Sequence, residues 1–231
     1  MLLEIIAANM EDVIDINRME IDRIELCGEM DQDGLTPDRN LIRCALQESE
    51  IPVNVMIRPH DDSFTYTIDE INQMTEDIEY VKNTGANGIV IGAITKDNVV
   101  DTVALERLIE SAGDLEITFH KAFDEIADQA DALKTLGRYP QVRTVLTSGG
   151  PGSSADNIGQ LRILVRLGNE LNLTVMPGGG INLENANKVS GTAGPHAIHL
   201  GTGVRKDGTF NSRISEDKID QLRRAIGKNE S

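Results

Sequence analysis

Ile24-Glu25-Leu26-Cys27-Gly28 is the stretch that decides the fold of this chain, because a short apolar run ends there in polar residues and glycine. The same pattern recurs at residues 55–59, 118–121, 146–150, 175–180 and 198–201. When parallel strands close into an α/β barrel, the residues at their C-terminal ends converge on one mouth, where active sites lie. The recurrence therefore predicts a barrel with its functional site at that mouth.

Apolar runs place eight strands along the chain, at residues 2–7, 22–26, 53–58, 88–92, 116–120, 142–147, 174–177 and 197–201. Their starts advance by roughly 20 to 35 residues, the length of one strand-loop-helix-loop unit. No linker interrupts the units, so residues 1–231 are expected to form a single domain. A single-domain (β/α)8 TIM barrel of parallel strands is favoured over an open sheet, because no GxGxxG follows the first strand and polar strand ends are spread widely.

Capping residues indicate where several helices begin. Thr67 and Glu70 form a capping box, in which a hydroxyl and a carboxylate satisfy two N–H groups of the first turn. Thr36 before Pro37 predicts a second helix start, since proline suits the first helical position. Further N-caps are expected at Asn182, before a helix at 183–189, and at Ser215, before a helix at 216–226.

The composition excludes several classes of protein. The net charge of −16 opposes binding to nucleic acid or to an anionic membrane surface. Two cysteines without a CxxC motif oppose a disulfide framework or a zinc finger. No apolar run approaches the roughly 20 residues of a membrane span, and residues 1–6 lack the basic region of a signal peptide. We expect a cytoplasmic protein with neither a nucleic-acid nor a membrane partner.

Polar strand residues are expected in the barrel lumen, because helices cover the outside and strand side chains alternate with a period of two. This set comprises Glu4, Arg23, Glu25, Arg58 and His120. Buried charges must be paired, so Glu25 is expected to be ionised and paired with Arg58 or Arg23. The alternative is a structural ion network of Glu4, Arg23 and Glu25 in the barrel floor, which suits Glu4 and Arg23 as well as a functional role does. Glu25, Arg58 and His120, nearer the mouth, are predicted to form one catalytic cluster.

Two histidines are candidates for acid/base chemistry. His120 ends the fifth strand, and Asp124 is expected either to orient it or to pair with Lys121. His199 on the eighth strand is the second candidate. Both histidines also fit a structural role at the barrel rim. If they converge with Glu25, the three side chains form a candidate metal site.

Glycine clusters follow three neighbouring strands and predict an anion site. Gly178-Gly179-Gly180 follows the seventh strand, and Gly201-Thr202-Gly203 follows the eighth. Loops at these places often bind phosphate through backbone N–H groups, and Ser148-Gly149-Gly150 extends the cluster. Tight turns would explain the glycines equally well. The predicted ligand contacts are Ser148, Gly149, Gly179, Gly180, Gly201 and Thr202.

Together the strand-end motifs resemble the copper homeostasis protein CutC family. The matching segments are Asp22-Arg23-Ile24-Glu25-Leu26-Cys27, Gly34-Leu35-Thr36-Pro37, residues 51–59, Phe64-Thr65-Tyr66, residues 88–93, residues 118–124, residues 146–150 and residues 176–181. The resemblance covers nearly the whole chain in order. It implies a TIM barrel, a cytoplasmic location and a role in copper homeostasis.

The resemblance also bears on Cu(I). Family members proposed to bind Cu(I) carry a cysteine just after the glutamate that matches Glu4, whereas this chain has Ile5-Ile6. Cys27 matches the cysteine of the second strand and is expected to be accessible at the mouth. One thiol with Met56 or Met176 nearby is a poor site for soft Cu(I). The resemblance therefore implies weak Cu(I) binding through Cys27 at most.

Two functions follow from these patterns. By resemblance the chain is a copper homeostasis protein; alternatively it is a TIM-barrel enzyme that acts on a small anionic or phosphorylated substrate at the C-terminal mouth. Lys121 stands where the family usually has arginine, which keeps the charge but loses the planar guanidinium. The expected partners are a small anionic ligand or a copper ion, and assembly into a homo-oligomer is left open.

Overall fold

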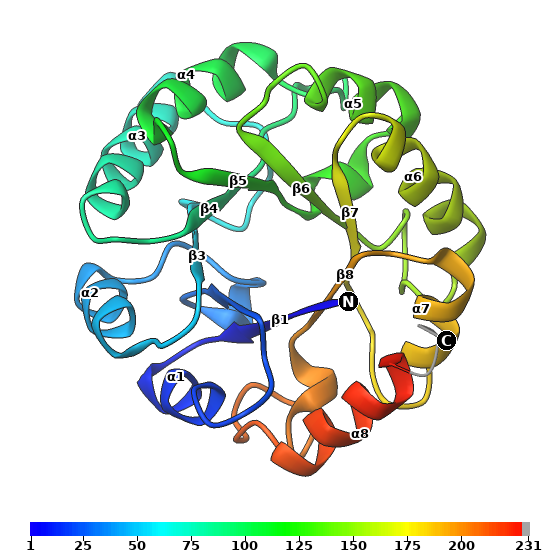
Figure 1. Cartoon of the computed structure of the whole chain (residues 1–231). Coiled ribbons are helices and arrows are strands. Elements are labelled where there is room, and N and C mark those ends of the chain that lie inside the picture. Colours follow the sequence, from blue (N-terminus) through cyan, green and yellow to red (C-terminus); the bar gives the residue numbers. More distant parts are fainter. Residues whose placement is uncertain (228–231) are drawn as a thin grey trace.

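Strands and helices alternate regularly along residues 1–227, the part of the chain that the computed structural model describes (Figure 1). The eight strands are β1 Leu2–Ala7, β2 Arg23–Leu26, β3 Val53–Met56, β4 Gly88–Ile91, β5 Glu116–Phe119, β6 Val142–Thr147, β7 Thr174–Pro177 and β8 Ala197–Leu200. The eight α-helices are α1 Met10–Ile16, α2 Arg39–Glu48, α3 Ile68–Lys82, α4 Thr102–Ala112, α5 Gln129–Leu136, α6 Ile158–Glu170, α7 Ala186–Ala193 and α8 Glu216–Gly227. Three short 3-10 helices follow β2, β5 and β8: η1 Met30–Gln32, η2 Lys121–Glu125 and η3 Thr202–Val204.

The strands form a closed parallel barrel. Each strand from β1 to β7 pairs with the next in chain order, and β8 pairs with β1. A parallel bridge between Gly178 and His199 joins the loop after β7 to β8 and completes the ring. The helices surround the strands as an outer layer (Figure 1). The predicted (β/α)8 TIM barrel is confirmed.

Strand register separates an apolar outer layer from a polar lumen. Leu3 and Ile5 of β1 are fully buried in the main hydrophobic core, which fills the space between strands and helices. Between them, Glu4 pairs in register with Arg23 of β2 and with His199 of β8. Three charged or titratable side chains thus occupy one level of the lumen, as the period of two predicts.

The predicted strand bounds agree with the structure to within two residues. One difference falls at an N-terminal end, since β2 begins at Arg23 and not at Asp22. The others fall at the C-terminal ends, where Arg58, Gly92, His120 and Gly201 lie just beyond the paired segments. These residues leave the sheet because their backbones turn into the loops that form the mouth.

The predicted helix start at Thr36 is wrong. The N-cap of α2 is Asp38, whose carboxylate accepts two first-turn N–H groups. The Thr36 hydroxyl instead accepts a hydrogen bond from the N–H of Arg58 and donates one to its carbonyl oxygen. Thr36 therefore ties the loop after β2 to the end of β3.

Of the remaining predictions of helix caps, some are confirmed and one is wrong. The capping box of Thr67 and Glu70 is confirmed at the start of α3. Ser215 directly precedes α8, where its hydroxyl accepts the N–H of Lys218. The prediction for Asn182 is wrong, because Asn182 forms a separate turn and Asn185 is the N-cap of α7.

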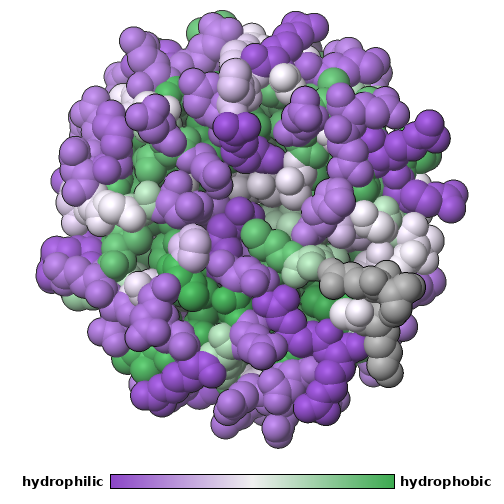
Figure 2. Space-filling view, viewed as in Figure 1, coloured by the Kyte–Doolittle hydropathy of each residue, from purple (hydrophilic) through white to green (hydrophobic). Residues whose placement is uncertain are grey.

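The surface is predominantly hydrophilic on the face that Figure 2 shows, with apolar side chains visible between polar ones. Among residues 1–227, every helix is too short or too polar to cross a bilayer.

Candidate functional site

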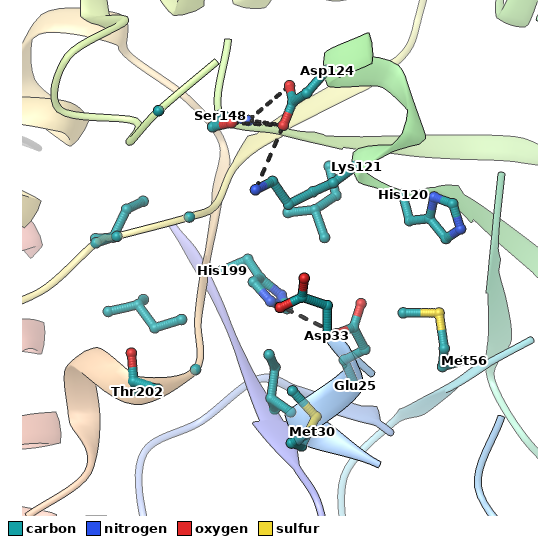
Figure 3. Close-up of a pocket in the computed structure, with 18 of the residues that line it drawn as sticks. Glu25, Met30, Asp33, Met56, His120, Lys121, Asp124, Ser148, His199 and Thr202 are labelled. Atoms are coloured by element: carbon teal, nitrogen blue, oxygen red, sulfur yellow. Dashed lines mark hydrogen bonds and ion pairs between the residues drawn. The ribbon is translucent and has the colours of Figure 1, made fainter. Parts of the chain in front are cut away.

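A cavity of about 800 Å³ opens at the C-terminal ends of the strands (Figure 3). This volume lies within the range of small-molecule sites. The predicted cluster at one mouth is present, since Glu25, Arg58 and His120 all line the cavity. Other predicted residues that line it are Asp124, Ser148, Gly179, Gly180, His199, Gly201 and Thr202.

A buried ion network lies at the level of Glu4. Its Oε2 accepts a hydrogen bond from Nε of Arg23, and its Oε1 lies 2.8 Å from Nδ1 of His199. Burial opposes ionisation of Glu4, but the hydrogen bond with His199 and the charge of Arg23 outweigh it, so the pKa of Glu4 is lowered. Arg23 fits the structural role, whereas Glu4 also orients a residue of the cavity.

His199 lies between two carboxylates. Because Nδ1 faces Glu4, that nitrogen carries a proton, and Nε2 is left to exchange its proton with the cavity side. Nε2 lies 3.7 Å from Oε2 of Glu25. Burial acts to lower the pKa of His199, but the charge of Glu25 and the hydrogen bond to Glu4 outweigh it and raise the pKa.

The predicted pairing of Glu25 with Arg58 or Arg23 is wrong. Arg23 is engaged by Glu4, its register partner, and Glu25 instead accepts the thiol hydrogen of Cys27 (3.4 Å) and faces His199. Its Oε1 is buried and has no hydrogen-bond partner among the described residues. Burial raises the pKa of Glu25, and the charge of His199 offsets this only in part.

Arg58 contacts backbone oxygens and, among residues 1–227, no carboxylate. Its Nη1 lies 3.3 to 3.4 Å from the carbonyl oxygens of Gln32, Asp33 and Gly34, and its guanidinium carbon lies 4.7 Å from the ring centre of Phe64. Arg58 follows the paired part of β3, so it reaches the loop after β2 and misses the lumen carboxylate. Its role here is to hold that loop beside the cavity.

His120 is held as a neutral imidazole. Its Nδ1 accepts the N–H of Ala122 (3.1 Å), so the proton resides on Nε2, which is buried without a partner in the described residues. Burial and the charge of Arg58 lower the pKa of His120 to about 3. The ring packs against Gly92, where an added Cβ would lie 2.4 Å from Nδ1. His120 is therefore a poor general base near neutral pH.

Asp124 does not orient His120. Its carboxylate accepts hydrogen bonds from the Thr147 hydroxyl and from both the N–H and the hydroxyl of Ser148. Its Oδ2 also lies 3.7 Å from Nζ of Lys121. The alternative pairing of Asp124 with Lys121 is thus the one found, because η2 directs Asp124 toward β6.

The loops after β7 and β8 present backbone donors at the cavity. Gly179 and Gly180 have φ angles of +102° and +69°, which favour glycine. A Cβ at Gly179 would lie 3.2 Å from Nζ of Lys121, so the ammonium group lies beside this loop. Within residues 1–227, no hydrogen bond occupies the N–H groups of Gly179, Gly180, Gly201 or Thr202. Unoccupied N–H groups beside an ammonium group suit an anion.

The third glycine loop contributes less than predicted. Ser148 lines the cavity, but its N–H and hydroxyl both bond to Asp124. Gly149 lies outside the lining, and its N–H donates to the hydroxyl of Thr147 at 2.8 Å. This loop therefore orders Asp124, and its Ser148 and Gly149 N–H groups are not free to contact an anion.

The expectation that Cys27 is accessible is wrong. Its side chain is 1 % exposed and packs with Ile6, Met56 and Met30. Burial and the nearby charge of Glu25 raise the pKa of the Cys27 thiol well above its ordinary value. The thiol is covered because η1 and the loop after β2 fold over it.

Titratable ligand atoms converge at one point in the lumen. Atoms of Glu4, Glu25 and His199 lie within 4.8 Å of one another, a spacing that a metal ion would accept. Of the predicted trio, Glu25 and His199 converge, but His120 does not belong to this group. Because Glu4 is already paired with Arg23, the arrangement suits proton transfer at least as well.

Three residues make contacts in the structure that the sequence did not predict. Glu4 fixes the tautomer of His199, and Lys121 lies beside the glycine loop after β7. Met30 joins Cys27 because η1 turns back over β2. The position of Lys121, next to a candidate histidine at a strand end, was the one signal for these contacts that the sequence offered.

Comparison with known proteins gives the family. The model of the CutC family matches residues 1–204. A CutC protein of Glaesserella parasuis is 36 % identical over 212 residues, covering 92 % of this chain and 86 % of that protein. A CutC protein of Salmonella typhimurium is 37 % identical over 203 residues, with 88 % and 80 % covered.

Solved structures agree with this assignment. The CutC structure from Streptococcus agalactiae, proposed to be a copper homeostasis protein, has a TM-score of 0.81 and 32 % identity, covering 87 % of this chain and 98 % of that one. N-(5'-phosphoribosyl)anthranilate isomerase from Pyrococcus furiosus, at 16 % identity, a TM-score of 0.64 and 99 % of each chain covered, shares the fold alone. The chain belongs to the CutC family.

Proposed function

We propose that this chain is an enzyme that transfers a proton to or from a small anionic substrate at the C-terminal mouth of the barrel. One observation carries the proposal: Glu25 and His199, the latter held by Glu4, line the same cavity as unoccupied N–H groups and an ammonium group. We place this activity in the cytoplasm, since Cys27 and Cys44, both free thiols, suit a reducing compartment.

Glu25 and His199 have the properties of an acid/base pair. A raised pKa of Glu25 brings a carboxyl group closer to neutral pH, where general catalysis is most efficient. His199 can deliver or remove a proton at Nε2, because Glu4 holds Nδ1–H. Glu4 thus acts as a positioning residue in the manner of the acid in a catalytic triad.

The test follows hydrogen exchange and needs no knowledge of the product. Small phosphorylated and carboxylated carbonyl compounds are incubated with the protein in D₂O, and loss of a C–H signal is measured by NMR. We expect exchange in at least one compound and a decrease of about 100-fold or more in Glu25→Gln. Glu110→Gln, at an exposed position of α4, should exchange like the wild type. Equal exchange in Glu25→Gln would refute the assignment.

A second candidate function is copper homeostasis through weak Cu(I) binding. It is supported by membership of the CutC family and by soft donors in one wall: a Cβ at Gly34 would lie 3.4 Å from the sulfur of Cys27 and 3.6 Å from that of Met30. The fit is partial, because Ile6 packs on Cys27 where a second thiol would complete the site.

Competition against a Cu(I) chelator tests this candidate. We expect weak binding that disappears in Cys27→Ala and persists in Cys44→Ala, the control on α2. Tight stoichiometric binding that survives Cys27→Ala would exclude the Cys27 site.

A further inference from the structure

We propose that the loops after β7 and β8, together with Lys121, bind the phosphate group of a phosphate monoester and select it over a carboxylate. This inference rests on the proposed function and names the class of its anionic substrate. It depends on three observations: the separate elements that supply the donors, the position of the cation and the space left for the rest of the ligand.

The donors come from separate elements. N–H groups of Gly179 and Gly180 belong to the loop after β7, and those of Gly201 and Thr202 follow β8. The ammonium group of Lys121 comes from η2, after β5. Donors that approach from three strands suit a tetrahedral group with three terminal oxygens, whereas a planar carboxylate offers two oxygens in one plane.

Lys121 is the cation placed to meet this group. Its Nζ lies beside Gly179 and 3.7 Å from Asp124, whose carboxylate already accepts hydrogen bonds from Thr147 and Ser148. The carboxylate of Asp124 thus has hydrogen-bond partners other than Lys121, and the ammonium group remains able to bind an anion. The Lys121 side chain is 46 % exposed, so it is accessible to a ligand. Arg58, the other basic side chain of the lining, is occupied by backbone oxygens.

Glycine is required at the centre of this site. A side chain at Gly179 would have to adopt a φ angle of +102° and would place its Cβ 3.2 Å from Nζ of Lys121. A Cβ at Gly180 would lie 2.8 Å from that of Ser153. Bare backbone therefore lies where an anion can approach the N–H groups closely.

The space beyond the donors extends to the acid/base pair. The same cavity of about 800 Å³ includes Glu25 and His199, so a phosphate held at the glycine loops leaves room for an organic portion beside them. A phosphate monoester has that form: an anchoring dianion and a carbon skeleton that carries the reacting hydrogen.

The experiment uses a matched pair of small probes, methyl phosphate and acetate, with the full-length protein labelled with ¹⁵N. We expect methyl phosphate to shift the amide signals of Gly179, Gly180, Gly201 and Thr202, and to bind at least about 10-fold more tightly than acetate. Lys121→Met should weaken methyl phosphate binding by about 10- to 100-fold, the worth of one hydrogen bond to a charged group. Lys121→Arg should retain most of it.

Lys96→Met is the control, because it removes the same charge from an exposed loop residue outside the cavity lining. Equal binding of acetate and methyl phosphate, unchanged affinity in Lys121→Met, or amide shifts confined to other loops would each overturn the inference. The test separates this inference from the proposed function, since methyl phosphate binding requires neither Glu25 nor His199. Hydrogen exchange without methyl phosphate binding would preserve the acid/base pair and remove the phosphate site.

Discussion

At the scale of single residues, burial and a neighbouring charge have opposite effects on the ionisation of Glu25 and of His199. Burial disfavours the charge of Glu25 and the charge of His199 alike, yet each favours ionisation of the other. Glu4 breaks this balance, because its hydrogen bond fixes one nitrogen of His199. The resulting arrangement places a proton donor and a proton acceptor 3.7 Å apart within one wall.

Glu25→Gln is expected to stabilise the protein at pH 7 by about 1 kcal/mol. The pKa of Glu25 is raised in the folded state, so the folded protein holds this proton more tightly than the unfolded chain, and stability falls as pH rises above the ordinary value of 4.5. Denaturant unfolding at pH 4 and pH 7 checks this, and the gain should be confined to pH 7. A variant less stable at pH 7 would mean that the pair with His199 is net stabilising.

His120 makes the opposite contribution. Its pKa of about 3 lies below the ordinary 6.5, so the stability that its neutral form provides is present above pH 6.5 and is lost as pH falls toward 3. His120→Gln cannot take up this proton, and its loss of stability between pH 7 and pH 4 should be smaller by about 3 kcal/mol. Urea titrations at both pH values measure the difference. His196→Gln, at an exposed position, should behave like the wild type.

At the scale of elements, the sequence predicted most of what positions the site. Strand ends and the faces of strand residues follow from local rules, namely apolar runs and the period of two, and Glu4, Arg23 and Glu25 accordingly lie in the lumen. Partner choice does not follow from such rules. Arg58 does not pair with Glu25, because carbonyl oxygens of the loop after β2 lie nearer to its guanidinium. Cys27 is buried because η1 folds back over it. Both outcomes depend on loop paths that no periodicity encodes.

Gly92 at the end of β4 tests how tightly a strand end holds its neighbour. Gly92→Ala would place a Cβ 2.4 Å from the ring of His120 and 3.1 Å from Ala122, so it should destabilise the protein by about 1 to 3 kcal/mol. Gly159→Ala in α6, where a Cβ meets nothing within 4 Å, should instead stabilise it by up to about 1 kcal/mol. Thermal unfolding of both variants makes the comparison, and similar effects would contradict the packing of His120 on Gly92.

At the scale of the whole molecule, a buried ion pair joins the first and last units of the barrel. Arg205, just after η3, holds Asp12 of α1 through two hydrogen bonds of 2.7 and 3.1 Å, and both side chains are almost completely buried. This contact strengthens the closure that β1 and β8 make through the backbone. A second arginine pair, Arg213 with Asp15, spans the same units at the surface.

The two pairs should differ in their effect on stability. Asp12→Ala leaves a charged arginine buried and should cost about 3 to 5 kcal/mol. Asp15→Ala removes a partner from an arginine that is 49 % exposed and should cost less than about 1 kcal/mol. Urea unfolding of the two variants decides this, and equal losses would show that burial is not what makes the Asp12 contact strong.

Because β1 pairs with β8, the barrel can close only after nearly the whole chain has been synthesised. Glu4 and His199 are separated by 195 positions, so the first strand has one finished edge long before its second neighbour is made. At a translation rate of about 5 to 20 residues per second, the second edge of β1 and the carboxylate of Glu4 remain unpaired for roughly 10 to 40 seconds. A nascent chain of this kind is exposed to edge-to-edge association throughout that time. We therefore expect slower translation or a smaller supply of chaperones to lower the yield of folded protein.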